Sequence, residues 1–334
     1  MSARRADAPP QPTGPEALRP ALSRGHVDPA GHRRTDDAWL ERAWADPGTR
    51  VLVLESGDPG SYGWQALLAR QSRALVTAGP DGHRLVFVPP AAAPEGERYL
   101  LGADDEGHAY FAVRAAGGAP FPEVAGAEPA SLREVGALLD DRDSGLLTHA
   151  VAVANWNAGT RFCRSCGAPL RMAAAGHVRM CDAEGIEHFP RTDPAVIMLV
   201  HREVDGAEQC LLGHNPRWPE NRYSVLAGFV EPGESLEQAV AREVAEEVGV
   251  AVADPRYLGS QPWPFPRSLM LGFTARAVGT AERTDAQEIS DVRWFTRPEL
   301  LAAAESGAVL LPGPVSIARK LIEHWYGGPL PGGW

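Results

Sequence analysis

Carboxylates cluster in one stretch of the chain, 228-GFVEPGESLEQAVAREVAEEVGV-250. Glu243, Glu246 and Glu247 are spaced i, i+3 and i+4, which on a helix places them on one side with Cβ atoms about 5–6 Å apart. Like charges so placed repel each other, so the cluster costs stability unless a cation neutralises it. Oxygen ligands in this number suit a hard divalent cation, Mg²⁺ or Mn²⁺. Arg242 is placed to orient one of the carboxylates through a bidentate pair.

Three cysteines have the spacing of a structural zinc site. Cys163-x2-Cys166 is followed fifteen residues later by Cys181, and thiolates at such spacings bind zinc. No further cysteine follows at short range, so a complete site needs a substitute fourth ligand. The candidates are His188, Glu184 and His177. A knuckle that folds without metal is the alternative. The last cysteine, Cys210, lies in an apolar run and is expected to be a buried core thiol.

The carboxylates require a helix over about 235–248 and a sheet behind it. Ser235 followed by Gln238 is a capping-box signature for the helix start, and Gly249 supplies its C-terminal stop. An apolar stripe on the helix can pack on a sheet. It consists of Leu236, Ala239, Val240, Val244 and Val248. Strands are expected at 195–201, 209–213, 223–230, 256–260, 269–277 and 291–295, and a final helix at 315–326.

The first half of the chain is expected to form a separate α+β domain. Residues 1–35 are rich in Pro, Ala, Gly and Arg without apolar periodicity, which predicts a disordered tail. Short apolar runs then predict a small antiparallel sheet, followed by two helical stretches. The runs are 51–55, 84–88 and 109–113, and the helical stretches are 131–141 and 145–159. The predicted organisation is a tail (1–35), an α+β domain (36–160), a zinc-ribbon-like knuckle (161–192) and a catalytic domain (193–334).

Composition restricts the classes of function. The 334 residues include 32 Lys and Arg against 43 Asp and Glu, a formal net charge of −11, which disfavours general binding of nucleic acid. No stretch approaches the ~18 apolar residues of a membrane helix, and the N-terminus lacks the apolar core of a secretory signal. Few cysteines, two of them a close pair, fit a reducing compartment. We therefore expect a cytoplasmic protein that does not associate with membranes.

The carboxylate stretch resembles the Nudix box at every defined position. These positions are Gly228, Glu234, Arg242, Glu243, Glu246, Glu247 and Gly249. Nudix hydrolases cleave a nucleoside diphosphate linked to another group, by metal-assisted attack of water on a pyrophosphate phosphorus. The resemblance implies an α/β/α sandwich around a mixed sheet. The alternative, a solvated acidic helix face, is how most Glu-rich helices should be interpreted, but it leaves the agreement of loop and helix unexplained.

A second motif, 260-SQPWPFPRS-268, narrows the substrate. Three prolines in nine residues predict a stiff, non-helical loop that carries Trp263 and Phe265 beside polar groups. From the residues alone, these aromatics could equally belong to the core. The motif is similar to the SQPWPFPxS signature of the NADH pyrophosphatase branch of the Nudix family. Further similarity lies at 188-HFPRTDPAVI-197, 226–231 and 316–323. The resemblance implies hydrolysis of NADH or NAD⁺ to AMP and (reduced) nicotinamide mononucleotide.

The resemblance also implies roles for individual residues. Glu243 and Glu247 match carboxylates that hold the metals, and Glu246 matches a third, which is either a ligand or the group that activates water. Glu288 matches a carboxylate from outside the helix that completes the metal shell or acts as base. The implied substrate contacts are Ala227, Gln261, Pro262, Trp263, Pro264, Phe265, Pro266, Arg267, Ser268, Phe189, Ala318 and Arg133. Phe189 is expected to stack on a base. Arg133 is either a phosphate contact or a structural arginine.

The resemblance carries two further expectations. A homodimer is expected, and the knuckle is expected to hold zinc through Cys163, Cys166 and Cys181 with His188 as a candidate fourth ligand. The same chemistry would also remove NAD caps from RNA 5′ ends, which is the alternative substrate. A non-catalytic dinucleotide sensor is a third interpretation, although a binding protein has no need of so costly a carboxylate cluster.

Overall fold

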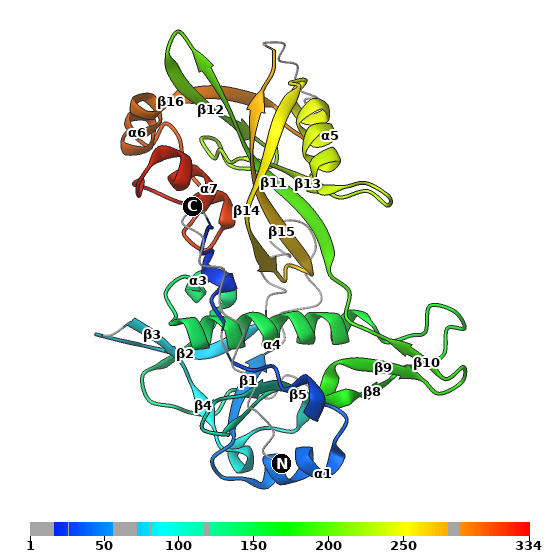
Figure 1. The fold of residues 1–334 in the computed structure, drawn as a ribbon. Coiled ribbons are helices and arrows are strands. Elements are labelled where there is room, and N and C mark those ends of the chain that lie inside the picture. Colours follow the sequence, from blue (N-terminus) through cyan, green and yellow to red (C-terminus); the bar gives the residue numbers. More distant parts are fainter. Residues whose placement is uncertain (1–16, 26, 56–71, 81, 117–119, 280–287) are drawn as a thin grey trace, which may run out of the picture. The chain divides into compact units, whose positions relative to one another are not determined.

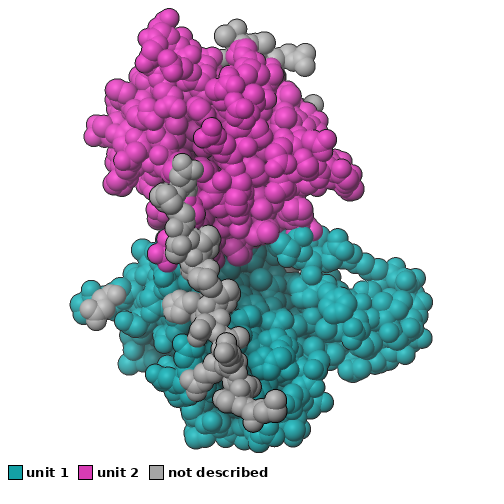
Figure 2. All heavy atoms as spheres, viewed as in Figure 1, with its two compact units in different colours: residues 1–11, 24–192, 264–267 teal, residues 12–23, 193–263, 268–334 magenta. Residues whose placement is uncertain are grey.

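The computed structural model describes residues 17–25, 27–55, 72–80, 82–116, 120–279 and 288–334 (Figure 1). The chain divides into two compact units (Figure 2). The described residues of the first unit fall within 24–192 and 264–267, and those of the second within 17–23, 193–263 and 268–334. No helix of the described residues is long and apolar enough to cross a membrane.

The first unit contains a seven-stranded sheet in its described part. The strands are β1 (Arg50–Glu55), β2 (Arg73–Gly79), β3 (Gly82–Leu85), β4 (Phe87–Val88), β5 (Gly96–Ala103), β6 (Ala109–Ala115) and β7 (Ala127–Ser131). The central order is β3-β2-β1-β6-β5, with β4 on β1 and β7 on β2. β1 and β6 run parallel, so the expectation of an antiparallel sheet is wrong for this pair. Val51 to Leu54 are all buried, as is typical of a central parallel strand.

The helices of the first unit differ in part from expectation. They are α1 (Asp37–Ala45), α3 (Leu132–Val135) and α4 (Asp141–Gly159), with short 3₁₀ helices at Gly31–Arg33, Pro90–Ala92 and Ala174–Gly176. The helix expected over 131–141 is therefore mostly wrong. Asp140 explains the difference, because its carboxylate accepts the backbone N–H of Asp143 (2.8 Å) and caps a new helix there.

The predicted tail is wrong for residues 17–25 and 27–35. Leu18 N donates to Leu258 O (2.9 Å), and Ala21–Ser23 forms a 3₁₀ helix with Leu22 buried. Ala103 N donates to Asp28 O (2.9 Å). Residues 1–16, also predicted as tail, lie outside the described residues. Short stretches such as these carry too few apolar residues to show a period.

The cysteine stretch forms a small three-stranded antiparallel ribbon within the first unit. Its strands are β8 (Arg171–Ala173), β9 (Val178–Cys181) and β10 (Ile186–His188), in the order β10-β9-β8. Cys163, Leu170 and Cys181 form its small buried core.

The second unit is a sheet between two layers of helices, the expected α/β/α sandwich (Figure 1). The strands are β11 (Asp193–Val204), β12 (Ala207–His214), β13 (Leu226–Phe229), β14 (Val252–Trp263), β15 (Ser268–Ala277) and β16 (Asp291–Thr296). The order is β14-β15-β11-β12-β16 with β13 on β11. The β11–β15 pair is parallel and the others are antiparallel, so the sheet is mixed.

Alternate residues of β11 divide the core of this unit. Val196, Met198 and Val200 pack with α5 (Leu236–Val248), whereas Ile197 and Leu199 pack with α6 (Arg297–Glu305) and α7 (Ile317–Tyr326). The six expected strands and the two expected helices are present. The segment 260–268 is not a loop but a hairpin end, because β14 runs to Trp263 and β15 begins at Ser268.

Candidate active site

Helix α5 begins and ends where the sequence predicts. Ser235 Oγ accepts from Gln238 N (3.2 Å), and Gln238 Oε1 accepts from Ser235 N (2.8 Å). Gly249 ends the helix in the left-handed region (φ 70°), with its N–H bonded to Ala245 O. These two ends fix the rotation of the helix, so its apolar stripe faces the sheet. Glu243 and Glu247 are carried into the same buried layer, at 8% and 6% exposed.

Gly228 lets the carboxylate of Glu243 lie against strand β13. A Cβ atom at residue 228 would come within 1.8 Å of Glu243 Cδ and about as close to both oxygens. Real Cβ atoms are essentially never closer than 3.0 Å to a heavy atom to which they are not linked through the neighbouring chain. The first glycine of the motif is therefore required by packing against a carboxylate, and not by backbone conformation.

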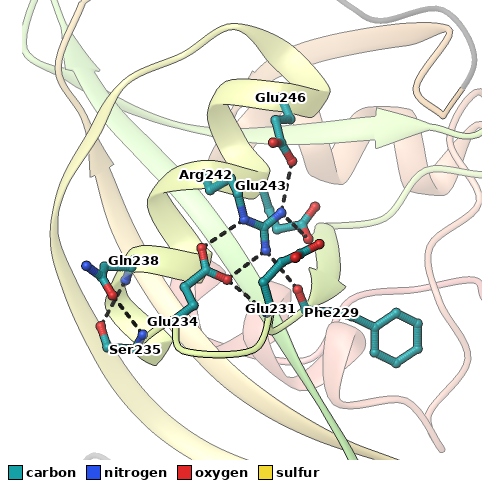
Figure 3. A network of polar contacts seen from close by, with 8 residues as sticks. All are labelled: Phe229, Glu231, Glu234, Ser235, Gln238, Arg242, Glu243 and Glu246. Atoms are coloured by element: carbon teal, nitrogen blue, oxygen red, sulfur yellow. Dashed lines mark hydrogen bonds and ion pairs between the residues drawn. The ribbon is translucent and has the colours of Figure 1, made fainter.

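Arg242 organises the carboxylates around one guanidinium group (Figure 3). Nε and Nη2 each donate to one oxygen of Glu234 at 2.8 Å, the expected bidentate pair. Nη1 donates to Glu243 and Glu246, both at 2.9 Å, and Nη2 also donates to Phe229 O at 2.8 Å. All five N–H donors of the side chain are thus used. Arg242 holds the loop that precedes α5 to the acidic side of the helix.

The local electrostatics leave negative charge in excess. Hydrogen bonding to Glu234 is the main cause that raises the pKa of Arg242, and the same bond lowers the pKa of Glu234. Burial raises the pKa of Glu243, and the charges of Glu246 and Glu288 add to the rise, whereas Arg242 opposes it. One guanidinium therefore does not compensate these carboxylates. A second source of positive charge would stabilise their ionised forms.

The donor set fits a hard divalent cation. The carboxylates of Glu243, Glu246, Glu247 and Glu288 come from one helix and one following segment, and they offer oxygen ligands alone. Glu243 and Glu246 each give one oxygen to Arg242. Among the described residues these carboxylates are not gathered as tightly as the cysteine cluster below. The side chain of Glu246 is 61% exposed, so its bond to Arg242 is the main restraint on its turning toward a cation.

A cavity of about 220 Å³ opens beside Glu247 within the second unit. It brings together four of the predicted site residues, which are far apart in sequence: Ala227, Glu247, Trp263 and Ala318. Glu247 is the one charged side chain among the lining residues. Sequence reasoning missed Asn215, Trp218 and Trp334, which also line the cavity. They lie in irregular segments, where no motif or period marks them.

The remaining residues of the predicted substrate loop have other surroundings. Gln261 is fully buried, and its Nε2 donates to Val315 O (3.1 Å). Pro262 lies in β14 one residue before its end, and Ser268 begins β15. Residues 264–267 cluster with the first unit, where Asn155 Nδ2 donates to Pro264 O (2.7 Å). This segment contains Phe265, Pro266 and Arg267, with a cis peptide bond between Phe265 and Pro266.

Arg133 and Phe189 lie in the first unit. The guanidinium carbon of Arg133 is 4.1 Å from the ring centroid of Phe265, and burial lowers the pKa of Arg133 to about 10. This contact favours the structural interpretation of Arg133. Phe189 is 58% exposed and lines a second cavity of about 420 Å³ with His188, Arg164 and Arg191. Its exposed ring remains available for stacking.

The three cysteines of the ribbon meet a carboxylate. Ligand atoms of Cys163, Cys166, Cys181 and Glu184 all lie within 4.8 Å of one another. Cys163 Sγ is 3.6 Å from Glu184 Oε2, and Cys166 Sγ is 3.6 Å from Cys181 Sγ. The predicted ligand His188 is outside this group.

Two other predictions about the thiols and their neighbours have clear outcomes. His177, the third candidate ligand, is buried and bonded to Leu100 O (2.8 Å), so it is occupied elsewhere. Cys210 is buried in the core of the second unit, as predicted. The backbone N–H of Cys166 is the main cause that lowers the pKa of Cys163 to about 7, and the side chain of His188 adds to it. The cluster thus favours a thiolate at one of its buried positions.

Comparison with known proteins agrees with this geometry. A family model described as "NUDIX domain" matches residues 191–312. "NAD-capped RNA hydrolase NudC" of Mycobacterium bovis is 42% identical over 315 residues, which cover 92% of this chain and 94% of that protein. The chain belongs to the Nudix hydrolase family. A second model, described as "NADH pyrophosphatase-like rudimentary NUDIX domain", matches residues 62–156 of this Nudix hydrolase.

Other relatives match a smaller share of this Nudix hydrolase. "NAD-capped RNA hydrolase NudC" of Stutzerimonas stutzeri is 44% identical over 60% of this chain and 68% of that protein. Human "NAD-capped RNA hydrolase NUDT12" is 41% identical over 56% of this chain and 42% of that protein. Among solved structures, a Nudix hydrolase from Nitrosomonas europaea is 22% identical, with coverage of 52% and 96% and a TM-score of 0.36. Nudix hydrolases use divalent metals, in agreement with the carboxylate set.

Proposed function

We propose that this Nudix hydrolase cleaves the pyrophosphate bond of NADH or NAD⁺, giving AMP and (reduced) nicotinamide mononucleotide. The observation that carries the proposal is the buried carboxylate layer of α5 beside a cavity lined by Trp263 of the 260–268 motif. A dinucleotide needs both a place for charged phosphates and a place for a flat ring. The two lie next to each other here, because Glu247 belongs to both.

The carboxylates would hold Mg²⁺ or Mn²⁺, and such ions activate water and neutralise phosphate oxygens when bound. Glu243 and Glu247 are the buried holders, and Arg242 fixes the orientation of Glu243. Glu246 and Glu288 are exposed, and we assign to one of them the role of accepting the proton that the attacking water loses. The side chains themselves do not attack phosphorus. Their work is to position the charges that stabilise the transition state.

Product analysis with purified protein tests this function. NADH with Mg²⁺ should yield AMP, and Glu247→Gln should lower turnover by about 100-fold or more, since the loss of even an outer-shell partner of a metal costs 10–100-fold. Glu237→Gln is the matched control, because Glu237 is an exposed glutamate of the same helix. Release of another product without AMP would overturn the substrate, and equal turnover of both variants would overturn the site.

Removal of NAD caps from RNA is the second candidate, and the names of the relatives favour it. The bond cleaved is the same, so the two substrates differ only in whether an RNA chain is attached to the adenosine. The specificity constants for an NAD-capped oligonucleotide and for free NADH separate them. A roughly tenfold preference for the capped oligonucleotide that weakens with salt would establish an RNA substrate. Equal constants would show that the attached RNA contributes nothing to recognition, and a preference for free NADH would exclude the RNA substrate.

We also propose a zinc site in the ribbon with Glu184 in place of the predicted His188. Two tight turns support it. In 163-CRSCG-167, Gly167 N donates to Cys163 O (2.9 Å), and in 181-CDAEG-185, Gly185 N donates to Cys181 O (2.7 Å). Both glycines have positive φ, 75° and 66°. Glu184 therefore occupies in the second turn the place that Cys166 occupies in the first.

Zinc accepts this donor set because thiolate and carboxylate are both among its usual ligands, in four-coordinate sites. Two members of the set, Cys163 and Cys181, are buried, whereas Cys166 and Glu184 are exposed.

Cytoplasmic location and a homodimer stay proposals as well. All four cysteines are free thiols, which agrees with a reducing compartment, and measurement of the molar mass by light scattering would determine the oligomeric state.

A further inference from the structure

Two tryptophans outside every sequence motif, Trp218 and Trp334, line the cavity beside Glu247. Their ring centroids are 5.3 Å apart, with the planes inclined by 50°. Trp263 lines the same cavity, so three of the nine tryptophans of the chain surround one space. Large aromatic side chains at a cavity wall bind flat apolar surfaces. None of these three tryptophans is fully buried, so packing in the core does not by itself explain why they lie around one cavity.

The position of Trp334 is fixed by a buried arginine. Arg319 is 5% exposed, and its Nη1 donates to Gly332 O (2.8 Å) and Pro312 O (3.3 Å), while Nη2 donates to Leu330 O. Glu323 accepts from Nε of Arg319 at 2.8 Å. The segment 328–334 has no regular structure, so these bonds specify its path. The buried Arg319 therefore stabilises one conformation of residues 328–334.

The segment that carries Trp218 is tied to the same strip of chain. Leu310 N donates to Asn221 O (2.6 Å), and Tyr223 N donates to Leu310 O (3.1 Å). The next residue, Leu311, accepts the backbone N–H of Trp334 (3.1 Å). Neighbouring residues thus hold the two tryptophan-bearing segments side by side. The pair is therefore built into the fold and does not depend on a chance contact between surface rings.

The indole Nε1 of Trp334 is buried and has no hydrogen-bond partner among the described residues. A buried indole N–H normally has an acceptor, so an acceptor on a ligand would complete it. The cavity wall contains one charged side chain, Glu247, among otherwise apolar or neutral residues. Its volume of about 220 Å³ is below the ~300–1,000 Å³ of pockets that enclose a whole ligand. The cavity therefore suits one ring system and not an entire dinucleotide.

We infer that Trp218 and Trp334 form the wall on which one heteroaromatic ring of the substrate, adenine or nicotinamide, stacks while the diphosphate lies at the carboxylates. The inference rests on the proposed function and adds two substrate-binding residues to it. Stacking holds the ring in the ground state and in the transition state alike. Loss of the wall should therefore raise KM and leave kcat nearly unchanged.

Paired substitutions separate stacking from mere bulk. Trp334→Leu keeps an apolar side chain without a flat face, and Trp334→Phe keeps the face. We expect Trp334→Leu to raise KM for NADH by roughly tenfold or more, as loss of a base-stacking aromatic does, and Trp334→Phe to retain most of the affinity. Calorimetric titration with AMP and with nicotinamide mononucleotide, which are not hydrolysed, shows which ring is bound: the affinity of that mononucleotide alone falls in Trp334→Leu.

Several outcomes would overturn the inference. They are equal KM values for the Leu and Phe variants, a fall in kcat at constant KM, unchanged affinity for both mononucleotides, or no binding of either by the unsubstituted protein. A structural anchor would instead lower the urea midpoint without moving KM. If Trp334→Leu does not fold, Trp218→Leu and Trp218→Phe decide. Failure of the unsubstituted protein to release AMP from NADH refutes the proposed function, whereas the titrations test the stacking wall independently.

Discussion

Gly228→Ala should displace the carboxylate of Glu243, the proposed metal ligand, without removing any proposed site residue. The new methyl carbon would lie 1.8 Å from Glu243 Cδ, and ordinary contact begins at 3.4 Å. The carboxyl group must therefore retreat by about 1.6 Å, which breaks its 2.9 Å bond to Arg242. Misplacement of a reacting group by about 1 Å can cost 10²-fold in rate. We expect turnover of NADH to fall by about 100-fold or more.

The same substitution should cost only part of the stability. Extra atoms in a packed site destabilise by about 1–3 kcal/mol, and the atoms in the way belong to the end of a side chain. Gly233→Ala is the matched control in the same loop. Its φ is +92°, so alanine is strained there, but no atom lies within 4 Å of the new Cβ. Gly233→Ala should lower the urea midpoint comparably while turnover stays near that of the unsubstituted protein.

A second substitution, Glu243→Asp, should restore part of the activity that Gly228→Ala removes. Glu243→Asp removes one methylene, so in Gly228→Ala/Glu243→Asp the shorter side chain escapes the new methyl group. The assay is AMP release from NADH at saturating Mg²⁺ for both single variants and the double variant. The double variant should lose less activity than the product of the two single losses, because the two sites share one contact. Losses that multiply, or a Gly228→Ala turnover within about threefold of the unsubstituted protein, would refute the explanation.

Two further predictions concern the first unit. Burial lowers the pKa of His149 to about 3 and that of His177 to about 4, from about 6.5 in an unfolded chain; their stabilisation is complete above pH 6.5 and is lost as the pH falls toward 4. The urea midpoint of the unsubstituted protein should drop between pH 7 and pH 5, and it should drop less steeply in His177→Gln. A urea midpoint that does not change over this pH range would contradict the prediction. Glu184→Cys should strengthen the retention of zinc against a chelator, and Glu184→Gln should weaken it, whereas the control Glu187→Gln should retain zinc like the unsubstituted protein. Atomic absorption measures the metal content. Identical retention in all three variants would remove Glu184 as a ligand.

The sequence predicts helix α5 better than any other element, because the signals that define it are local. Ser235, Gln238 and Gly249 set both ends of α5 through contacts within a few residues, and the carboxylate spacing follows from the helical period. The strands of the second unit were equally accessible, since their apolar runs are buried by helices on both faces. These features depend on neighbours in the chain, which a sequence displays directly.

Features that depend on distant contacts were not predicted. The segments that carry Trp218 and Trp334 are held by bonds to residues 310–311, and these segments have no period. The parallel pairing of β1 with β6 joins residues about sixty positions apart. Glu184 could be named only as one of three candidates, because only the folded ribbon shows which of them lies within 4.8 Å of the three thiols. The hairpin at 260–268 was mistaken for a loop since prolines usually interrupt strands.

Each unit contains a buried acidic side chain that contacts an arginine, but the two acids differ in how far the protein compensates their charge. Asp143 in α4 is completely buried, and Leu85 N (2.8 Å) and Arg142 Nε (2.8 Å) donate to its two oxygens. Those donors satisfy it within the protein, so it stabilises the first unit. Glu243 in α5 also meets an arginine, yet burial and neighbouring carboxylates still raise its pKa. A buried acid that the protein leaves undercompensated is the one that a cation must complete, which is why the second domain, and not the first, is expected to hold the catalytic metal.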